Sequence, residues 1–150
     1  MPAFSPDTSC MVASLCTWHA HHDPAREEIS QRLERGETLI VAAPALVESY
    51  AVLTRLPAPF RLAPADAGAL LETNFVRAGR VLALAAPAYR RLLRRAPAEG
   101  IAGGRMYDAV IAECLLKARP ATLLTFNARH FLAFSGRGLE IVVPGESDAR

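Results

Sequence analysis

The chain has 150 residues, of which 51% are hydrophobic and 21% are charged. This length and composition predict one globular domain over residues 1–150 and exclude a disordered chain. No apolar run reaches the roughly 18 residues of a membrane span, and MPAFSPDTSC lacks the basic and apolar regions of a signal peptide. The cysteines have no CxxC spacing and favour free thiols in a reducing cytoplasm. They are Cys10, Cys16 and Cys114.

The net charge of +2 conceals an asymmetry along the chain, because residues 1–75 are acidic overall and residues 76–150 are basic. The densest basic cluster is YRRLLRRAP. Helical spacing places its arginines on shared faces in two pairs, Arg90 with Arg94 and Arg91 with Arg95. Such a face suits a phosphate backbone, and a merely solvated helix face is the alternative.

Short aliphatic strands alternate with helices along the chain. The predicted strands are residues 2–6, 38–41, 81–84, 123–125 and 139–143. The predicted helices are residues 9–17, 24–35, 44–56, 64–78, 86–95 and 105–117. This alternation predicts parallel strands in a three-layer α/β/α sandwich, with a site beyond the carboxyl ends of the strands.

Three acidic side chains lie where such a site is expected. Asp7 directly follows the first predicted strand, Glu48 is the only charge in an almost wholly apolar helical stretch, and Asp108 lies about four residues into its helix. Each has an ordinary alternative role. Asp7 suits an N-cap, although Thr8 or Ser9 could cap in its place, whereas the two helical acids suit a salt bridge or the helix dipole.

If the three carboxylates converge, their mutual repulsion requires a cation or shifted pKa values. Hard oxygen ligands favour Mg²⁺ or Mn²⁺, ions that polarise a phosphoryl oxygen and generate hydroxide from bound water. The pattern therefore points to phosphodiester hydrolysis, on the hypothesis that the three side chains meet in space.

Four segments, in this order, resemble a PIN domain and, within that family, a VapC-like toxin of bacterial toxin–antitoxin systems. The resemblance covers essentially the whole chain, and the stretch WHAHHDPAREEI also resembles the family. The four segments are PDTSCMVA with Asp7, PALVESYAVLTRLP with Glu48, GGRMYDAVIA with Asp108, and LLTFNARHF with Thr125, Asn127, His130 and Phe131.

The resemblance implies a PIN-like fold with a five-stranded parallel sheet and a divalent-metal-dependent endoribonuclease. It implies cleavage of structured RNA, often tRNA or rRNA, that leaves a 3′-hydroxyl and a 5′-phosphate. It also implies a homodimer, and a cognate antitoxin whose tail blocks the site and whose DNA-binding part represses the operon. The implied metal ligands are Asp7, Glu48 and Asp108, with hydrogen bonds to the site from Thr8 and Ser9.

The fourth segment departs from the family pattern. Many members carry an acid at the place of Asn127 or just before the closing Phe, where this chain has Asn127 and His130. An amide can still bind a metal-bound water or orient a carboxylate, so we expect Asn127 to act with the three acids and Thr125 to reach the rim of the site. Three carboxylates predict one Mg²⁺ held by the protein, or Mn²⁺, with any second ion arriving with the RNA phosphate.

The basic side chains of this segment have two interpretations each. His130 either contacts phosphate or donates a proton to the leaving oxygen, or it is a hydrogen-bonded imidazole beside Phe131. Arg129 is expected to be exposed, either on the RNA backbone or simply solvated. The histidines of WHAHH lack zinc spacing and are expected to be loop and cap residues, with RNA contact as the alternative. They are His19, His21 and His22.

Two other functions stay open at this point. The missing fourth acid motivates a catalytically weak PIN-like module that binds RNA or a partner protein. A phosphatase or phospho-acceptor domain would use Asp7, but its motif requires a second Asp where this chain has Ser9. The apolar stretches 47–56 and 62–71 are candidate surfaces for a second copy or an antitoxin, and core packing is the alternative.

Overall fold

The computed structural model describes residues 2–146, and its centre is a five-stranded sheet with the strand order β3-β2-β1-β4-β5. All four neighbouring pairs are parallel, as the alternation of elements predicts. The strands are β1 (Ala3–Pro6), β2 (Thr38–Ala42), β3 (Arg80–Leu82), β4 (Ala121–Leu124) and β5 (Leu139–Val142).

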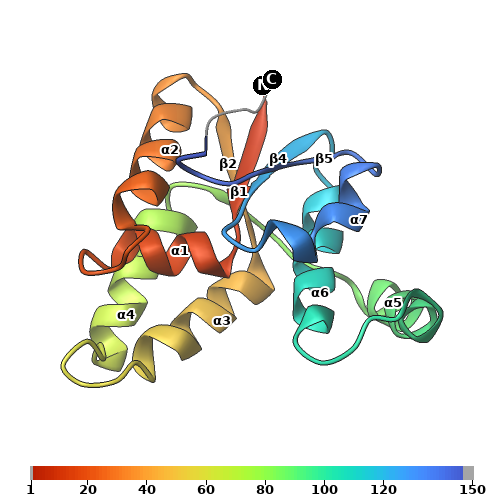
Figure 1. Ribbon diagram of the computed structural model, residues 1–150, viewed down its shortest axis with the longest axis horizontal. Coiled ribbons are helices and arrows are strands. Elements are labelled where there is room, and N and C mark those ends of the chain that lie inside the picture. The colour runs from red at the N-terminus through yellow and green to blue at the C-terminus, as the bar shows by residue number, and fades with distance from the viewer. Residues whose placement is uncertain (1, 147–150) are drawn as a thin grey trace.

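Helices connect the strands and cover both faces of the sheet. In Figure 1, α1 to α4 lie on one side of the sheet and α5 to α7 on the other, so the three-layer prediction is confirmed. The helices are α1 (Thr8–Leu15), α2 (His22–Glu34), α3 (Ala43–Thr54), α4 (Pro64–Leu71), α5 (Ala86–Glu99), α6 (Arg105–Leu116) and α7 (Leu132–Ser135). A π-helical turn, η1 (Glu72–Val76), and a 3₁₀ turn, η2 (Ala128–His130), complete the set.

The middle strands are buried because helices cover both faces of a parallel sheet. All four residues of β4 are buried, and in β2 only the first residue is exposed, whereas the edge strands β3 and β5 reach the surface. The core on either side of the sheet contains Phe4, Ile40 and Leu123, all fully buried. The carboxyl ends of the central strands are therefore held by the buried core of the sheet.

Several element boundaries differ from the predicted ones. Helix α5 continues through Pro97 to Glu99 instead of ending at residue 95, and the helix predicted over 64–78 becomes π-helical after Leu71. The third strand spans Arg80–Leu82 instead of 81–84, and β4 begins and ends earlier than predicted, which leaves Thr125 in the following loop. The short α7 and η2 were not predicted, because three or four residues carry no periodic signal.

The chain reverses its direction of travel across the sheet between β1 and β4. From β1 it moves to β2 on one side, and from β4 it moves to β5 on the other. In open α/β sheets, such a switch point leaves a crevice at the carboxyl ends of the two strands. Asp7 follows β1 and Thr125 follows β4, so the topology brings these two residues to that crevice.

The three cysteines are free and buried, as predicted. Within residues 2–146, no helix has the length and apolar character needed to cross a bilayer.

Candidate active site

Asp7 lies at the junction of β1 and α1 and is only 3% exposed. Its backbone N–H donates to the Leu124 carbonyl at 2.9 Å, which extends the β1–β4 ladder by one hydrogen bond. Its Oδ1 accepts from the Cys10 N–H at 3.0 Å, so Asp7 is the N-cap of α1. The N-cap role considered for Asp7 is confirmed, and Thr8 and Ser9 do not cap in its place because they already lie within the first turn of α1.

Two hydroxyl groups fix the carboxylate of Asp7 from opposite sides. Ser9 Oγ donates to Oδ1 at 2.6 Å and accepts from the Phe126 N–H at 3.0 Å. Thr125 Oγ1 donates to Oδ2 at 2.6 Å and accepts from the Asn127 N–H at 2.9 Å. A hydroxyl has one proton, and each of these accepts from a backbone N–H, so that proton goes to Asp7. The loop after β4 is thereby tied to the β1–α1 junction.

The pKa of Asp7 is raised from 3.8 to about 6. Burial is the main cause, and the nearby charge of Asp108 raises it further, while the hydrogen bonds from Ser9, Thr125 and the Cys10 N–H lower it. At neutral pH the carboxylate is mostly ionised although it is buried. A cation at this point would offset the free-energy cost of that charge.

Asp108 lies in the first turn of α6, and its side chain is 20% exposed. Its Oδ2 lies 2.8 Å from Nδ1 of His130, which donates when that nitrogen is protonated. Burial raises the pKa of Asp108, and the bond and charge of His130 together with Arg105 partly offset this rise. His130 is thus a hydrogen-bonded imidazole, but its partner is a candidate metal ligand. Phe131, beside it in sequence, is fully buried.

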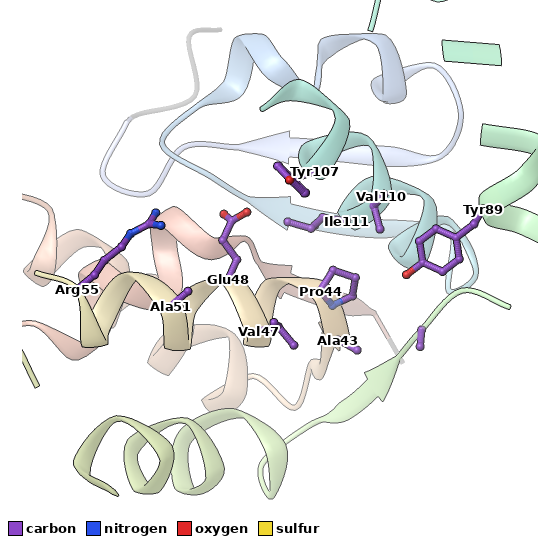
Figure 2. A pocket seen from close by; sticks show the side chains of 11 residues that line it. Ala43, Pro44, Val47, Glu48, Ala51, Arg55, Tyr89, Tyr107, Val110 and Ile111 are labelled. Atoms are coloured by element: carbon purple, nitrogen blue, oxygen red, sulfur yellow. The ribbon is translucent and has the colours of Figure 1, made fainter. Parts of the chain in front are cut away.

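Glu48 lies on α3 and is half-buried at the edge of a cavity of about 720 Å³ between α3, α5 and α6. Figure 2 shows its carboxylate projecting from α3 into this mostly apolar space, with Tyr107 of α6 and Arg55 nearby. Among residues 2–146, no basic nitrogen forms a salt bridge with it. A buried Arg partner, the alternative left open by the sequence, is therefore absent from the described part of the chain.

The three carboxylates are carried by elements that pack together, since α3 contacts both α1 and α6. They do not form a ready-made metal cluster: the described residues contain no group of three His, Cys, Asp or Glu side chains that could hold an ion. The donors are nevertheless suited to Mg²⁺ or Mn²⁺, since they are hard oxygens and Asp7 and Asp108 interact electrostatically. The role of the three acids as metal ligands stays a prediction.

Thr8 does not make the hydrogen bond to the site that the family resemblance implies. Its side-chain oxygen is buried and is the one such atom within residues 2–146 that has no hydrogen-bond partner. A buried hydroxyl without a partner costs roughly 1–3 kcal/mol, and an enclosed water would satisfy it. The polar side chains beside β1 and β4 thus offer oxygen atoms, the donor type that Mg²⁺ prefers.

The remaining predicted residues lie on the rim of the site. Asn127 and Arg129 are exposed. Asn127 supports the site through its backbone N–H, which donates to Thr125 Oγ1. Arg129 lines a cavity of about 520 Å³ together with Arg105, His130 and Arg137. These basic side chains lie beside Asp108, on the same helix or on the segment after β4.

The basic cluster on α5 is less available than its sequence indicates. Arg95 forms ion pairs with Glu99 at 3.2 Å and with Glu113 at 2.6 Å, so it is a structural residue. Arg90, Arg91 and Arg94 are exposed. The basic cavity near Asp108 has no signal in the sequence, because the residues that line it are scattered along the chain.

The histidines of the α1–α2 loop lie close to their expected places. His21 is at the N-cap position of α2 but makes no capping bond with its side chain. His22 begins α2 and is buried, with Nδ1 2.9 Å from the Ala13 carbonyl, while His19 Nδ1 accepts from the His21 N–H at 3.0 Å. His19 is a loop residue, as expected, whereas His22 is a buried residue of α2 and His21 occupies the N-cap position without capping.

Comparison with known proteins agrees with this fold. The family model of the PIN domain matches residues 5–135. Ribonuclease VapC40 of Mycobacterium tuberculosis is 42% identical over 125 residues, which covers 83% of this chain and 87% of the relative.

Two solved structures have the same fold. The crystal structure of M. tuberculosis VapC20, a sarcin–ricin loop cleaving toxin, has a TM-score of 0.65 at 16% identity and covers 87% of this chain and 94% of its own. VapBC-1 from nontypeable Haemophilus influenzae has a TM-score of 0.65 at 17% identity, covering 94% and 97%. The fold and the family match thus place the chain in the class of PIN domains. The chain belongs to the PIN domain family, and within it to the VapC ribonucleases, the toxins of type II toxin–antitoxin systems.

Proposed function

We propose that this protein is a Mg²⁺-dependent endoribonuclease that hydrolyses RNA phosphodiester bonds and leaves a 3′-hydroxyl and a 5′-phosphate. Nucleases of this family generally depend on a metal ion. The observation that supports the proposal most directly is the buried Asp7 at the switch point, under the influence of a second carboxylate, Asp108. Mn²⁺ would satisfy the same oxygen donors.

Asp7, Asp108 and Glu48 would hold the ion, which when bound polarises the phosphoryl oxygen and generates a hydroxide nucleophile. The protein contributes the positioning of these groups. Ser9 and Thr125 fix the orientation of Asp7, and His130 holds Asp108. Glu48, which has no salt-bridge partner among residues 2–146, is left to complete the ligand set when the ion arrives.

Basic side chains beside Asp108 are suited to the RNA backbone. Arg105, Arg129 and His130 line one cavity, together with Glu99 and with Arg137, which is paired with Glu113. Guanidinium groups such as those of Arg105 and Arg129 bind phosphate through two parallel hydrogen bonds. We propose that structured RNA, such as tRNA or rRNA, crosses this cavity. VapC20, a sarcin–ricin loop cleaving toxin, is in line with this class of substrate.

We further propose a cytoplasmic homodimer with a cognate antitoxin whose tail covers the site and whose DNA-binding part represses the operon. The neighbouring structure of VapBC-1 supports an antitoxin partner. The face of α3 suits a second copy or the antitoxin, because Val47 is 71% exposed beside the large cavity. In the stretch 62–71, Ala67 and Leu71 are buried in the core, which leaves less of it for a partner.

A catalytically weak module that binds RNA or a protein is the second candidate. The observation in its favour is that Asn127 and His130 stand where an acid is expected, and that His130 already occupies one oxygen of Asp108.

Cleavage assays with total RNA separate the two candidates. We expect the purified protein to cleave RNA with Mg²⁺ and not with EDTA. Asp108→Asn should lower the rate by more than the roughly 10–100-fold that loss of a residue supporting a ligand costs. Asp66→Asn is the matched control, since Asp66 is also in a first helical turn but is exposed. RNA binding without metal-dependent cleavage would favour the module, and full activity in a folded Asp7→Asn, Asp108→Asn double variant would contradict the ribonuclease site.

A further inference from the structure

Five aromatic rings form a row on the surface beside Asp7, here called the aromatic row. Trp18, His19 and His21 come from the α1–α2 loop, Phe60 from the turn after α3, and Phe126 from the loop after β4. Trp18 stacks on Phe60 with centroids 4.4 Å apart, and His21 stacks on Phe126 at 4.3 Å. His19 connects the two stacks, since its centroid is 5.7 Å from both Trp18 and His21.

The row is not simply part of the core. Trp18 is 46% exposed and Phe60 is 41% exposed, although each has one partner in a stack. His21 is exposed as well. Large aromatic side chains are usually well buried, and a contiguous exposed group of them commonly marks a binding site.

The inner end of the row is joined to the candidate active site. The Phe126 N–H donates to Ser9 Oγ, which donates to Asp7. The α1–α2 loop is anchored by His22, which is buried and hydrogen-bonds the Ala13 carbonyl. The two loops that carry four of the five rings are therefore tied to the elements around Asp7, which is what a positioning surface for a substrate requires.

We propose that the aromatic row binds unpaired nucleobases of the RNA substrate by stacking and leads the strand to Asp7. The inference rests on the proposed ribonuclease function. A base has two flat faces, and each base stacked on an aromatic side chain contributes about 1–3 kcal/mol with little preference for sequence. Proteins that recognise RNA sequence usually bind single-stranded loops, whose bases are free to stack in this way.

The chemistry of the row favours RNA over a protein helix. Two of its five rings are imidazoles with polar edges, so it lacks the continuous apolar stripe into which an amphipathic helix docks. The wide, mostly apolar cavity beside α3 suits such a helix better. The row also approaches Asp7 from the Ser9 side, whereas the basic cavity lies beside Asp108.

Trp18 is the only tryptophan of the chain, so its fluorescence reports on the row directly. The probe is a 12-nucleotide single-stranded RNA of mixed sequence, in EDTA to prevent cleavage. We expect saturable quenching of Trp18 emission, and much weaker quenching by the same RNA annealed to its complement. RNA that binds, as measured by anisotropy of a labelled strand, without changing Trp18 emission would overturn the proposal.

A pair of truncations tests the energetic contribution. Trp18→Ala should weaken binding of the single-stranded probe by roughly 5-fold to 100-fold, and Phe60→Leu should weaken it less. The matched control is Leu93→Ala, which truncates a 62% exposed side chain on α5, across the molecule from the row (Figure 1). Circular dichroism checks that the variants fold.

The outcomes distinguish this inference from the proposed function. If the wild type cleaves RNA with metal and Trp18→Ala has the same KM, the proposal for the aromatic row is overturned and the nuclease proposal stands. Quenching and weakened binding in Trp18→Ala, together with no cleavage by the wild type, support the row and contradict the nuclease. Equal losses of RNA affinity in Trp18→Ala and Leu93→Ala would also count against the row.

Discussion

Asp7 carries a charge at a place where a neutral side chain would be more stable. Its burial raises its pKa to about 6, although three hydrogen bonds favour the ionised form. The difference from 3.8 corresponds to about 3 kcal/mol of folding free energy that is lost when the group is ionised at neutral pH. Such a residue is explained by chemistry rather than by stability.

We therefore expect Asp7→Asn to stabilise the metal-free protein by up to about 3 kcal/mol at pH 7.5. Asn is as good an N-cap as Asp, so its oxygen retains the bond from the Cys10 N–H. Its amide nitrogen cannot accept from Thr125 Oγ1, which makes about 3 kcal/mol an upper bound. Because the folded pKa is raised, the penalty in the wild type is present above about pH 6 and disappears as the pH falls toward 3.8. Urea unfolding in EDTA at pH 7.5 and pH 5 should show the advantage of the variant shrinking at the lower pH.

The control is Asp66→Asn, an exposed acid whose replacement should have little effect at either pH. A wild type that equals Asp7→Asn in stability at pH 7.5 would mean that the buried carboxylate carries no net penalty.

Asn127→Asp tests whether the amide faces the ion. If it does, the added carboxylate should tighten Mn²⁺ or Mg²⁺ binding several-fold, because it supplies a negatively charged oxygen in place of a neutral one. Isothermal titration calorimetry measures this directly, with the exposed Asn74→Asp as control. Unchanged affinity would show that Asn127 serves the site only through its backbone N–H.

The acidic residues of the site were predictable from the sequence, whereas their bonding was not. Asp7 and Asp108 stand out because they follow a strand or begin a helix among apolar neighbours. The bond between Thr125 and Asp7 joins residues 118 positions apart, and His130 meets Asp108 only because the loop after β4 turns back toward α6. The only hint of the His130–Asp108 bond in the sequence is that His130 stands where many family members have an acid.

At the scale of elements, Glu113 of α6 holds two other segments in place. Its Oε1 accepts from Arg95 of α5 at 2.6 Å and from Arg137, which follows α7, at 2.8 Å. Burial alone would raise the pKa of Glu113, but the two guanidinium groups outweigh it and lower the pKa below its usual value. This cluster fixes the helices that carry Asp108 and line the basic cavity.

We expect Glu113→Gln to destabilise the protein by about 1–3 kcal/mol at neutral pH, because two charge-assisted hydrogen bonds are weakened. Since the folded pKa is lowered, the contribution of Glu113 is present above 4.5 and is lost as the pH falls through its folded value. Urea unfolding at pH 7 is the measurement. Glu99→Gln, which removes a 49% exposed partner of the same Arg95, should cost less than about 1 kcal/mol. Equal losses of stability in the two variants would contradict the prediction that Glu113 contributes more than Glu99.

The elements themselves were predicted well where they are long and periodic. All five strands and six of the helices have the expected type and order. The end of α5 was placed too early because Pro97 usually terminates a helix, and the π-helical turn η1 has no signature in hydrophobic spacing. Turns of three or four residues such as η2 and α7 are set by tertiary contacts.

At the scale of the whole molecule, the exposed apolar face of α3 predicts an assembly. Val47 is 71% exposed, so Val47→Asp should be tolerated in the monomer but would place an unpaired charge in an interface. We expect the wild type to be a dimer with twice the chain mass of 16.2 kDa. The variant should be a monomer with the mass of one chain. Light scattering after size-exclusion chromatography measures this. Leu132→Asp, at a 58% exposed site on α7, is the control, and a dimeric Val47→Asp would locate the interface elsewhere.

The hydrogen bond from the Asp7 N–H to Leu124 also makes the site part of the sheet. The amides of Phe126 and Asn127 are likewise engaged, each on a hydroxyl that bonds Asp7. Amide hydrogen exchange should therefore be slow at Asp7, Phe126 and Asn127, closer to the central strands than to surface loops. Opening the site then requires loosening the β1–β4 pair, so this nuclease would lose its active site and its central sheet in the same unfolding event.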